Sequence, residues 1–162
     1  MLELLSPAGS PEAVVAAVQS GADAIYMGFG PFNARREAHN FTEEELEAAV
    51  QYCHIRGCKV YVTLNTLARD RELAEVAKLA IRVSELGADA ILVQDLGLMK
   101  ILRTVVPGIP LHASTQMSVH SLAGVEAAAA LGASRVVLAR ELSIDQIRYI
   151  AQNSPIEIEV FV

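Results

Sequence analysis

Strand-length apolar runs alternate with segments of helical period along the whole chain, and this alternation restricts the fold more than any other feature. A glycine stands at several helix-to-strand corners, such as Gly21, Gly57 and Gly87, where it supplies a left-handed cap. Such an order is typical of βαβ units, which build a parallel sheet. The sequence therefore predicts an α/β protein.

The pattern predicts seven strands and six helices. The strands are expected over 3–7, 24–28, 59–65, 90–95, 111–117, 135–140 and 156–162. The helices are expected over 11–20, 43–56, 70–86, 97–105, 121–131 and 143–152. A TIM-type (β/α)8 barrel has one strand and two helices more and about 250 residues, so we expect a truncated barrel. A doubly wound open sheet is the alternative, although no Gly-x-Gly-x-x-Gly motif follows the first strand.

Residues 1–162 are expected to form a single domain, the N-terminal part of a barrel whose C-terminal part belongs to a parent protein. The last expected strand is apolar and ends with Val160, Phe161 and Val162. A bare parallel edge invites pairing with another chain. We therefore expect self-association through this strand.

The composition fits a folded domain, because 52% of the residues are hydrophobic and 20% are charged. The net charge of -6 lacks the basic signature of a nucleic-acid-binding chain, although a local arginine cluster can still hold a phosphate. Cys53 and Cys58 indicate neither a disulfide scaffold nor a zinc site. No signal peptide and no apolar run of about 18 residues is present, so a cytoplasmic location is expected.

Barrels of this kind carry their ligands at the carboxyl ends of the strands. The polar residues expected there are Ser6, Thr63, Asn65, Gln94, Asp95, His112, Ser114, Gln116, Arg140 and Glu141. Amide, hydroxyl and imidazole groups suit a planar hydrogen-bonding ligand, such as a nucleobase or a quinone, better than a bare metal. We therefore expect a recognition site without a metal.

The candidate catalytic residues are His112, Ser114, Gln116, Arg140 and Glu141. The first three alternate along one expected strand, which places them on the same face. The Ser-His spacing lacks the aspartate that orients a hydrolase triad, so a serine nucleophile is not favoured. The alternatives stay open: His112 as a core histidine, and Arg140 with Glu141 as an ion pair at the rim.

The 29–41 loop combines aromatic residues, paired arginines and amides on the expected catalytic side. Stacking on Phe32 and charge neutralisation by Arg35 and Arg36 would suit RNA or a nucleotide-like ligand. The expected substrate-binding residues are Asn33, Arg35, Arg36, Asn65, Gln94 and Asp95. The alternatives are a solvated loop with internally paired arginines, and a helix-capping role for Gln94 and Asp95.

The segment Gly-Ala-Asp-Ala-Ile occurs twice, at residues 21–25 and again at 87–91, each time at a helix-to-strand corner. Glycine supplies the cap, and aspartate supplies a short bond in the turn. We interpret the repeat as architecture and not as a ligand site.

Several stretches, in the same order along the chain, resemble peptidase family U32, a collagenase-like group of unknown catalytic type. They are residues 3–10, 32–36, 60–66, 112–116 and 137–143. The resemblance implies the N-terminal barrel of a larger bacterial protein. Several members are implicated in oxygen-independent hydroxylation of tRNA, ribosomal RNA or ubiquinone precursors. In such members, cysteines that follow the part resembling this chain are associated with an iron-sulfur cluster. Cys53 and Cys58 do not match those positions, so no cluster is expected in this fragment, although the full-length parent can hold one.

The resemblance and the residues together favour the substrate-recognition barrel of an RNA-modifying protein. We expect this barrel to be inactive when it is isolated from the rest of the parent protein. One alternative is a protease that depends on a metal or on His112 and Ser114, but no triad, HExxH motif or carboxylate pair supports it. Another alternative is a non-catalytic scaffold.

Overall fold

The computed structural model describes residues 2–34 and 40–162, whose strands form one sheet. The strands are β1 (Leu5–Pro7), β2 (Ala24–Gly28), β3 (Lys59–Leu64), β4 (Ala90–Val93), β5 (Leu111–Ala113), β6 (Ala133–Val137) and β7 (Glu157–Glu159). The helices are α1 (Pro11–Gln19), α2 (Glu43–His54), α3 (Leu73–Glu85), α4 (Leu96–Val105), α5 (Leu122–Ala130) and α6 (Ile144–Asn153). A short 3-10 helix, Thr115–Met117, follows β5.

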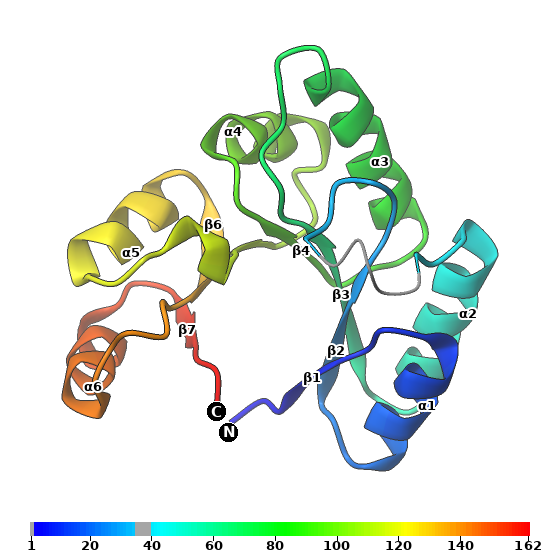
Figure 1. Cartoon of the computed structure of the whole chain (residues 1–162), viewed down its shortest axis with the longest axis horizontal. Helices are drawn as coiled ribbons and strands as arrows, with labels where there is room; N and C mark the ends of the chain where they lie inside the picture. Colours follow the sequence, from blue (N-terminus) through cyan, green and yellow to red (C-terminus); the bar gives the residue numbers. More distant parts are fainter. Residues whose placement is uncertain (1, 35–39) are drawn as a thin grey trace.

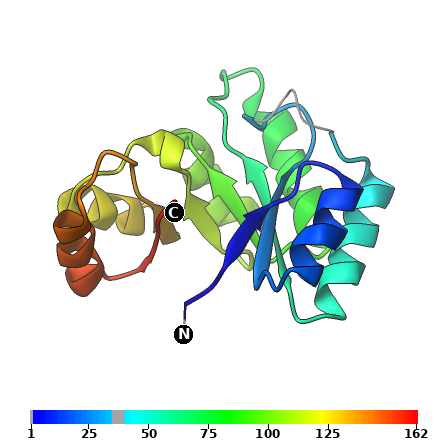
Figure 2. The same cartoon turned by 60° about the horizontal axis from the view of Figure 1, so that its bottom comes forward.

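The strands lie in the sheet in the same order as in the chain, and every neighbouring pair is parallel. A doubly wound sheet reverses its strand order at a switch point, so the open-sheet alternative is wrong. The strands curve around a common centre with the helices outside, and an opening separates β1 from β7 (Figure 1). A second view shows the helices on the outer face again (Figure 2). The prediction of a truncated barrel is confirmed.

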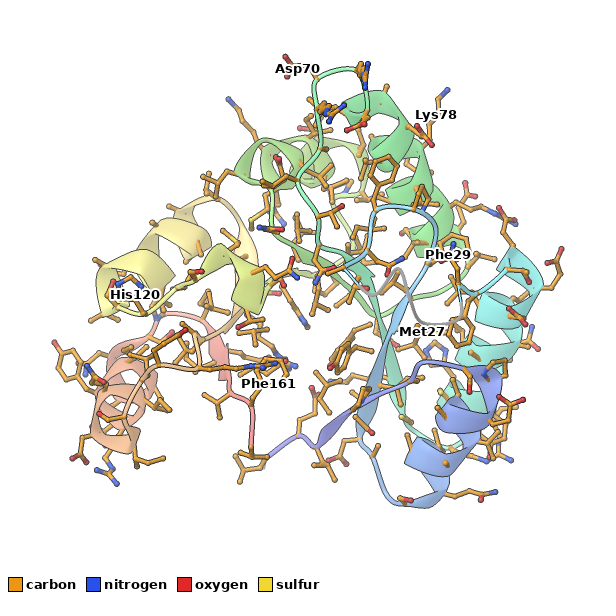
Figure 3. All side chains as sticks on the ribbon, viewed as in Figure 1. Met27, Phe29, Asp70, Lys78, His120 and Phe161 are labelled. Atoms are coloured by element: carbon orange, nitrogen blue, oxygen red, sulfur yellow. The ribbon has the colours of Figure 1, made fainter. Side chains whose placement is uncertain are left out.

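Two apolar layers lie on the two faces of the sheet. Between the sheet and the helices lies the larger core, which includes Val60, Val62 and Leu64 of β3. Inside the curve lies a smaller cluster with Ala24, Tyr61, Ala90, Leu92 and Val137. Met27 and Phe29 point toward the helical side (Figure 3). The alternation along β3 follows from the pleat of a strand, which sends successive side chains to opposite faces.

Side-chain caps mark where five of the described helices begin, and two of these caps are capping boxes. Thr42 and Glu45 form the expected capping box at α2, and Ser143 and Gln146 form another at α6. Each box satisfies N–H groups that have no partner within the helix. The longest helix, α3, has 13 residues. Across residues 2–34 and 40–162, no helix is long and apolar enough to cross a membrane.

The two aspartates of the repeated segment make the same contact. Asp23 Oδ2 accepts a hydrogen bond from the backbone N–H of Leu4 at 2.8 Å, and Asp89 Oδ2 accepts one from Val60 N–H at 2.7 Å. Each carboxylate thus fastens the strand that it precedes to the neighbouring strand before it. Gly21 and Gly87 have φ angles of 92° and 88°, as expected of left-handed caps. The repeated segment therefore has a structural role.

Only β2 has its predicted bounds, and three strands differ from theirs the most. The strand expected over 111–117 ends at Ala113, because Ser114 caps the 3-10 helix that follows. The strand expected over 135–140 lies at 133–137, and the one expected over 156–162 is limited to 157–159. A strand assignment needs a hydrogen-bonded neighbour, which an apolar sequence alone does not guarantee.

Candidate functional site at the carboxyl edge

Asn65 joins two segments at the carboxyl edge of the sheet, directly after β3. Its Oδ1 accepts a hydrogen bond from the backbone N–H of Ala34 at 3.0 Å, and its Nδ2 donates to Ser114 Oγ at 3.2 Å. Both side chains are buried, with 9% of Asn65 and 1% of Ser114 exposed. The amide therefore connects the 29–41 loop, β3 and the end of β5, on the side where barrels of this type hold ligands.

Asn33 is seated directly above Gly28 at the end of β2. Its Nδ2 donates to the carbonyl of Gly30 at 2.6 Å, and only 2% of the residue is exposed. A Cβ at position 28 would lie 2.7 Å from Asn33 Oδ1, which is closer than real Cβ contacts. Glycine at this position therefore leaves room for the loop to fold down onto the sheet.

The phenylalanines of the loop belong to the core. Phe29 and Phe41 form an isolated parallel bridge that brings the two ends of the loop together. Phe32 is 9% exposed and packs in the larger core, so the predicted stacking surface for a base is wrong. A large apolar ring gains more free energy from burial than from exposure at a rim. Arg35 and Arg36 lie outside the described residues, and their predicted role stays a prediction.

Gln94 and Asp95 follow β4 and make different hydrogen bonds. Gln94 Nε2 donates to the backbone carbonyl of Gln116 at 3.4 Å. Asp95 caps α4, because its Oδ1 accepts from Leu98 N–H at 2.8 Å and its Oδ2 accepts from Ala68 N–H at 3.4 Å. The capping alternative thus describes Asp95, and its predicted contact with substrate stays a prediction.

Gln116 does not share a strand face with His112 and Ser114, so that prediction is wrong. Ser114 Oγ accepts a hydrogen bond from Gln116 N–H at 3.4 Å, which begins the 3-10 helix and ends the alternation of side chains. Gln116 still lies at the carboxyl edge, where its carbonyl meets Gln94.

Thr66 is a polar group at this edge that the candidate residues did not include. Its Oγ1 is buried and has no hydrogen-bond partner in the part of the chain that the structure describes. An unpaired buried hydroxyl costs free energy, and this one has almost no exposed surface. Its position directly after Asn65, at a strand end, was the available signal in the sequence.

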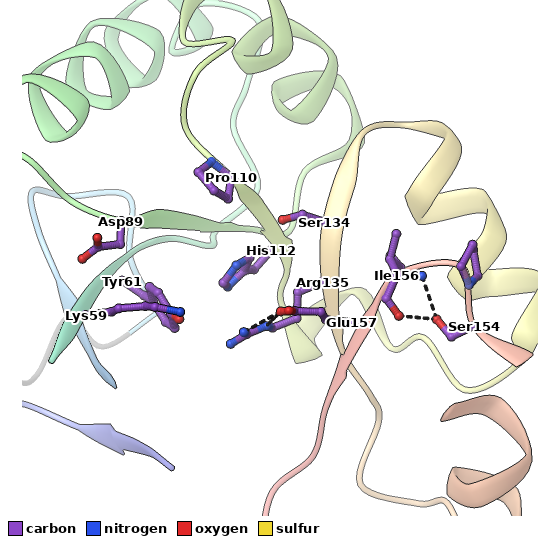
Figure 4. Close-up of a pocket in the computed structure, with 11 residues that line it drawn as sticks. Lys59, Tyr61, Asp89, Pro110, His112, Ser134, Arg135, Ser154, Ile156 and Glu157 are labelled. Carbon is purple, nitrogen blue, oxygen red and sulfur yellow. Dashed lines mark hydrogen bonds and ion pairs between the residues drawn. The ribbon is translucent and has the colours of Figure 1, made fainter. Parts of the chain in front are cut away.

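His112 lies apart from this edge, on the inner face of β5. Its ring meets Tyr61 edge to face, with ring centroids 4.8 Å apart. It lines a cavity of about 730 Å³ near the amino ends of β3 to β7, together with Lys59, Arg135 and Glu157 (Figure 4). Within residues 2–34 and 40–162, no hydrogen bond joins His112 to Ser114, and His112 Nδ1 has no partner.

Burial governs the charge of His112, because only 4% of the residue is exposed. Burial, and then the positive charge of Arg135, lower the pKa of His112 from 6.5 to about 3. The imidazole is therefore neutral at pH 7. A base with so low a pKa is weak, which does not favour His112 as the general base of a hydrolase.

A charged network lies at the amino end of the barrel, and none of its members was among the predicted site residues. Arg135 pairs with Glu3 and Glu157 at 2.6 Å each, while Glu3 also accepts from Lys59 at 2.9 Å and from the Tyr61 hydroxyl at 2.8 Å. Burial raises the pKa of Glu3, but the hydrogen bonds from Arg135, Lys59 and Tyr61 outweigh it and lower the pKa to about 2. Charged residues at inward strand positions were the signal in the sequence.

Arg140 and Glu141 do not pair with each other in the described part of the chain. The Arg140 guanidinium lies 4.2 Å from the ring centroid of Phe161, a cation–π contact. Both residues are exposed. The Arg140 side chain lines a groove of about 490 Å³ between α6 and the chain after β7. The alternative of an ion pair between them is therefore wrong, and the predicted catalytic roles stay predictions.

The two cysteines do not fit an iron-sulfur cluster. Cys53 and Cys58 are buried in the helical core, and burial raises the pKa of Cys53 to about 12. Clusters need thiolates, usually four. No group of three or more metal-binding side chains occurs among the residues described.

Comparison with known proteins gives a consistent assignment. The profile described as Peptidase family U32 matches residues 9–162. The chain is 41% identical over 161 residues to a 23S rRNA 5-hydroxycytidine synthase of Escherichia coli, a match covering 99% of this chain and 24% of the relative. It is 36% identical over 160 residues to the tRNA hydroxylation protein P1 of Bacillus subtilis, covering 99% and 38%. The chain thus spans less than two fifths of either relative.

One solved structure, described as a U32 peptidase, has a TM-score of 0.79 and 19% identity, covering 99% of this chain and 68% of the other. Likeness at that identity shows the barrel fold alone. The family profile covers nearly all of the sequence, and the predicted family resemblance is confirmed. The chain belongs to peptidase family U32.

Proposed function

We propose that this chain is the RNA-recognition barrel of a longer protein that takes part in hydroxylating a base of tRNA or ribosomal RNA. The names of both curated relatives describe hydroxylation of RNA, and the matches cover 99% of this chain. RNA of these kinds is found in the cytoplasm, which is where we expect the protein to act.

The polar cluster at the carboxyl edge carries the proposal. Gln94, Asn65 and Ser114 stand at the ends of three strands, where Asn65 donates to Ser114 Oγ and Gln94 donates to the Gln116 carbonyl. The partly exposed Gln94 amide offers a donor and an acceptor to the edge of a nucleobase that is unstacked from single-stranded RNA, while Asn65 and Ser114 hold the neighbouring strand ends in place. The edge therefore suits recognition of one splayed base.

Phosphate binding is assigned to the 29–41 loop, which contains Arg35 and Arg36. The net charge of -6 makes a general electrostatic attraction for RNA unfavourable, so the backbone contact has to be local. The arginine pair, which follows Asn33 and Ala34 in the sequence, would supply a bidentate phosphate contact. The thiols of this chain do not fit a redox centre, so we assign binding to these residues and no electron-transfer step.

The hydrolytic alternative receives less support from the geometry. Peptide hydrolysis by His112 and Ser114 requires the histidine to accept the serine proton over a hydrogen bond. Ser114 Oγ is instead bonded to Asn65 and to the backbone of Gln116, and His112 faces the amino-end cavity.

The test is nucleoside analysis in cells. The gene for the polypeptide that contains this chain is deleted, and tRNA and rRNA digests are compared by liquid chromatography and mass spectrometry. We expect one hydroxylated nucleoside to disappear and to return when the unchanged gene is restored. A gene with Arg35→Glu and Arg36→Glu should not restore it, whereas the exposed control Arg148→Glu should. Unchanged nucleosides after deletion would rule out the proposed function.

A further inference from the structure

We propose that the cavity at the amino end of the barrel binds a small organic cation, namely a primary ammonium group on a compact apolar body. This amino-end cavity has a volume of about 730 Å³ and lies at the opposite end of the strands from the carboxyl edge. Ligand pockets commonly have volumes of roughly 300–1,000 Å³. The inference goes beyond the proposed function and does not depend on it, because it uses a different set of residues.

The hydrogen-bond donors of the cavity wall are largely used by the protein itself. Ser134 donates from Oγ to the Leu111 carbonyl at 3.2 Å. Ser154 likewise donates from Oγ to the Ile156 carbonyl at 2.6 Å. A hydroxyl carries one proton and a carbonyl can only accept, so both serine oxygens offer a ligand nothing but an acceptor. Arg135 directs four hydrogen bonds to carboxylates. The wall therefore favours a ligand that donates hydrogen bonds.

Glu157 offers a carboxylate oxygen to the cavity. Its Oε2 receives bonds from both Nε and Nη2 of Arg135, at 2.9 and 2.6 Å. Its Oε1 makes no hydrogen bond within residues 2–34 and 40–162, and 68% of the side chain is exposed. An ammonium ion forms a charge-assisted hydrogen bond with such an oxygen, which is stronger than a bond between neutral groups. We therefore expect Glu157 to hold the cation.

His112 adds an unused acceptor in a side chain that is almost wholly buried. Its ring lines the cavity, and only 4% of the residue is exposed (Figure 4). Burial, and then the charge of Arg135, lower its pKa to about 3, so the imidazole is neutral at pH 7 and keeps one acceptor nitrogen. In the part of the chain that the structure describes, His112 makes no hydrogen bond. A neutral ring also does not repel a cation.

Negative charge exceeds positive charge around the cavity. The cations of its wall are Arg135 and Lys59. Four carboxylates line the cavity or pair with these cations: Glu3, Asp89, Glu157 and Glu159. Burial raises the pKa of Glu159, but the other three carboxylates alone outnumber the two cations. The local field therefore attracts a cation and repels an anion.

The body of the ligand has an apolar surface to rest on. Pro110, Pro155 and Ile156 line the cavity beside the polar groups. Apolar walls with a few placed polar groups are typical of sites for small molecules. No group of three or more metal-binding side chains occurs among the described residues, so an organic cation fits this wall better than a metal ion.

The experiment measures binding to the polypeptide that contains this chain, by isothermal titration calorimetry at pH 7. Three probes share one ring and differ in charge: cyclohexylmethylamine, cyclohexylmethanol and cyclohexanecarboxylate. We expect the amine to bind about tenfold more tightly than the other two, as one charge-assisted hydrogen bond predicts. The nitrogen-15 shifts of the His112 ring should change as the amine is added. No binding of the amine, or equal binding of the carboxylate, would overturn the proposal.

Two substitutions test the place of binding. Glu157→Gln removes the carboxylate charge with little change in size and should weaken amine binding about tenfold. Ile156→Trp fills the cavity without changing its charge, and it should weaken amine binding by at least the same factor. If Glu157→Gln does not fold, as judged by circular dichroism, Ile156→Trp decides the question.

Glu85 provides the matched control, because its side chain is 58% exposed and also pairs with an arginine, Arg82, at 3.2 Å. Glu85→Gln lowers the net negative charge by the same amount and should leave amine binding unchanged. Equal weakening in Glu85→Gln and Glu157→Gln would reduce the effect to general attraction and refute the site. Unchanged affinity in both cavity variants would refute it as well.

Discussion

Glu3 and Arg135, which are 132 residues apart in the chain, form an ion pair at 2.6 Å across the amino end of the barrel. Arg135 also holds Glu157 of β7, so one guanidinium connects the segment just before β1 with the last strand of the sheet. Charge-assisted bonds of this kind are strong when the partners are shielded from water.

The pH dependence of stability should report this pair. Because the folded pKa of Glu3 is about 2 and its ordinary value is 4.5, its contribution is complete above about pH 4.5 and is lost as the pH falls toward 2. We expect Glu3→Gln to cost about 1–3 kcal/mol at pH 7 and clearly less at pH 2.5, measured by urea unfolding. Asp145→Asn, which removes an exposed pair with Arg148, should cost less than about 0.5 kcal/mol. An equal cost of Glu3→Gln at both pH values would contradict the prediction.

The close contact between position 28 and Asn33 predicts that a loss of stability caused by Gly28→Ala is reduced by a second substitution at Asn33. Gly28→Ala places a methyl group 2.7 Å from Asn33 Oδ1 and should destabilise the fold by about 1–3 kcal/mol. In an Asn33→Ala background the clash is absent, so the same change should cost markedly less. Gly108→Ala, where no atom lies within 4 Å of the new Cβ, is the control for the loss of a glycine. Thermal unfolding of the four variants and the parent distinguishes these outcomes, and additive effects at positions 28 and 33 would count against the contact.

His112 should remain neutral far below the usual pH range for histidine. Its folded pKa of about 3 lies below the ordinary 6.5, so the unfolded chain binds a proton first as the pH falls. Stability is therefore lost between about pH 6.5 and 3, at a rate approaching 1.4 kcal/mol per pH unit. His112→Phe should remove that slope. Nitrogen-15 shifts of the ring follow the titration directly, and a midpoint near 6.5 in the folded chain would refute the assignment.

Self-association through the end of the chain stays a prediction, and it can be tested by substituting an exposed apolar residue of this segment. Phe161 is 44% exposed beside the groove after β7. If this surface pairs, the mass from light scattering should rise with protein concentration, and Phe161→Ser should reduce the rise. Tyr149→Ser on α6, at a side chain that is 60% exposed, is the matched control. A constant monomer mass at all concentrations would remove the prediction.

The order of the elements could be predicted because its signals are local. Thr42 with Glu45 and the glycines at positions 21 and 87 act within a few residues of their own helix, so the sequence pattern contains the whole interaction. The end of β5 could not be predicted in this way. The strand was predicted to continue to Met117, but the Ser114 hydroxyl accepts from Gln116 N–H and the backbone continues as a 3-10 helix.

Part of the candidate site could be predicted because strand ends can be located from local sequence signals. Asn65, Ser114 and Gln94 stand at strand ends, and parallel strands bring such ends to one edge. The contacts of Arg135 with Glu3 and Glu157 depend on the curvature of the whole sheet, which no short pattern records. Phe32 was misjudged because an aromatic residue in a long loop can turn inward as readily as outward.

The paired aspartates have a consequence for how the chain assembles. Asp23 closes a loop of 19 residues with Leu4, and Asp89 closes one of 29 residues with Val60. Closing a short loop loses less chain entropy than closing a long one. These fastened strand pairs should therefore form early in folding, and the 132-residue closure between Glu3 and Arg135 should form last. Neighbouring strand pairs would then form one after another along the chain, and the ion pair between Glu3 and Arg135 would form in the last step of folding.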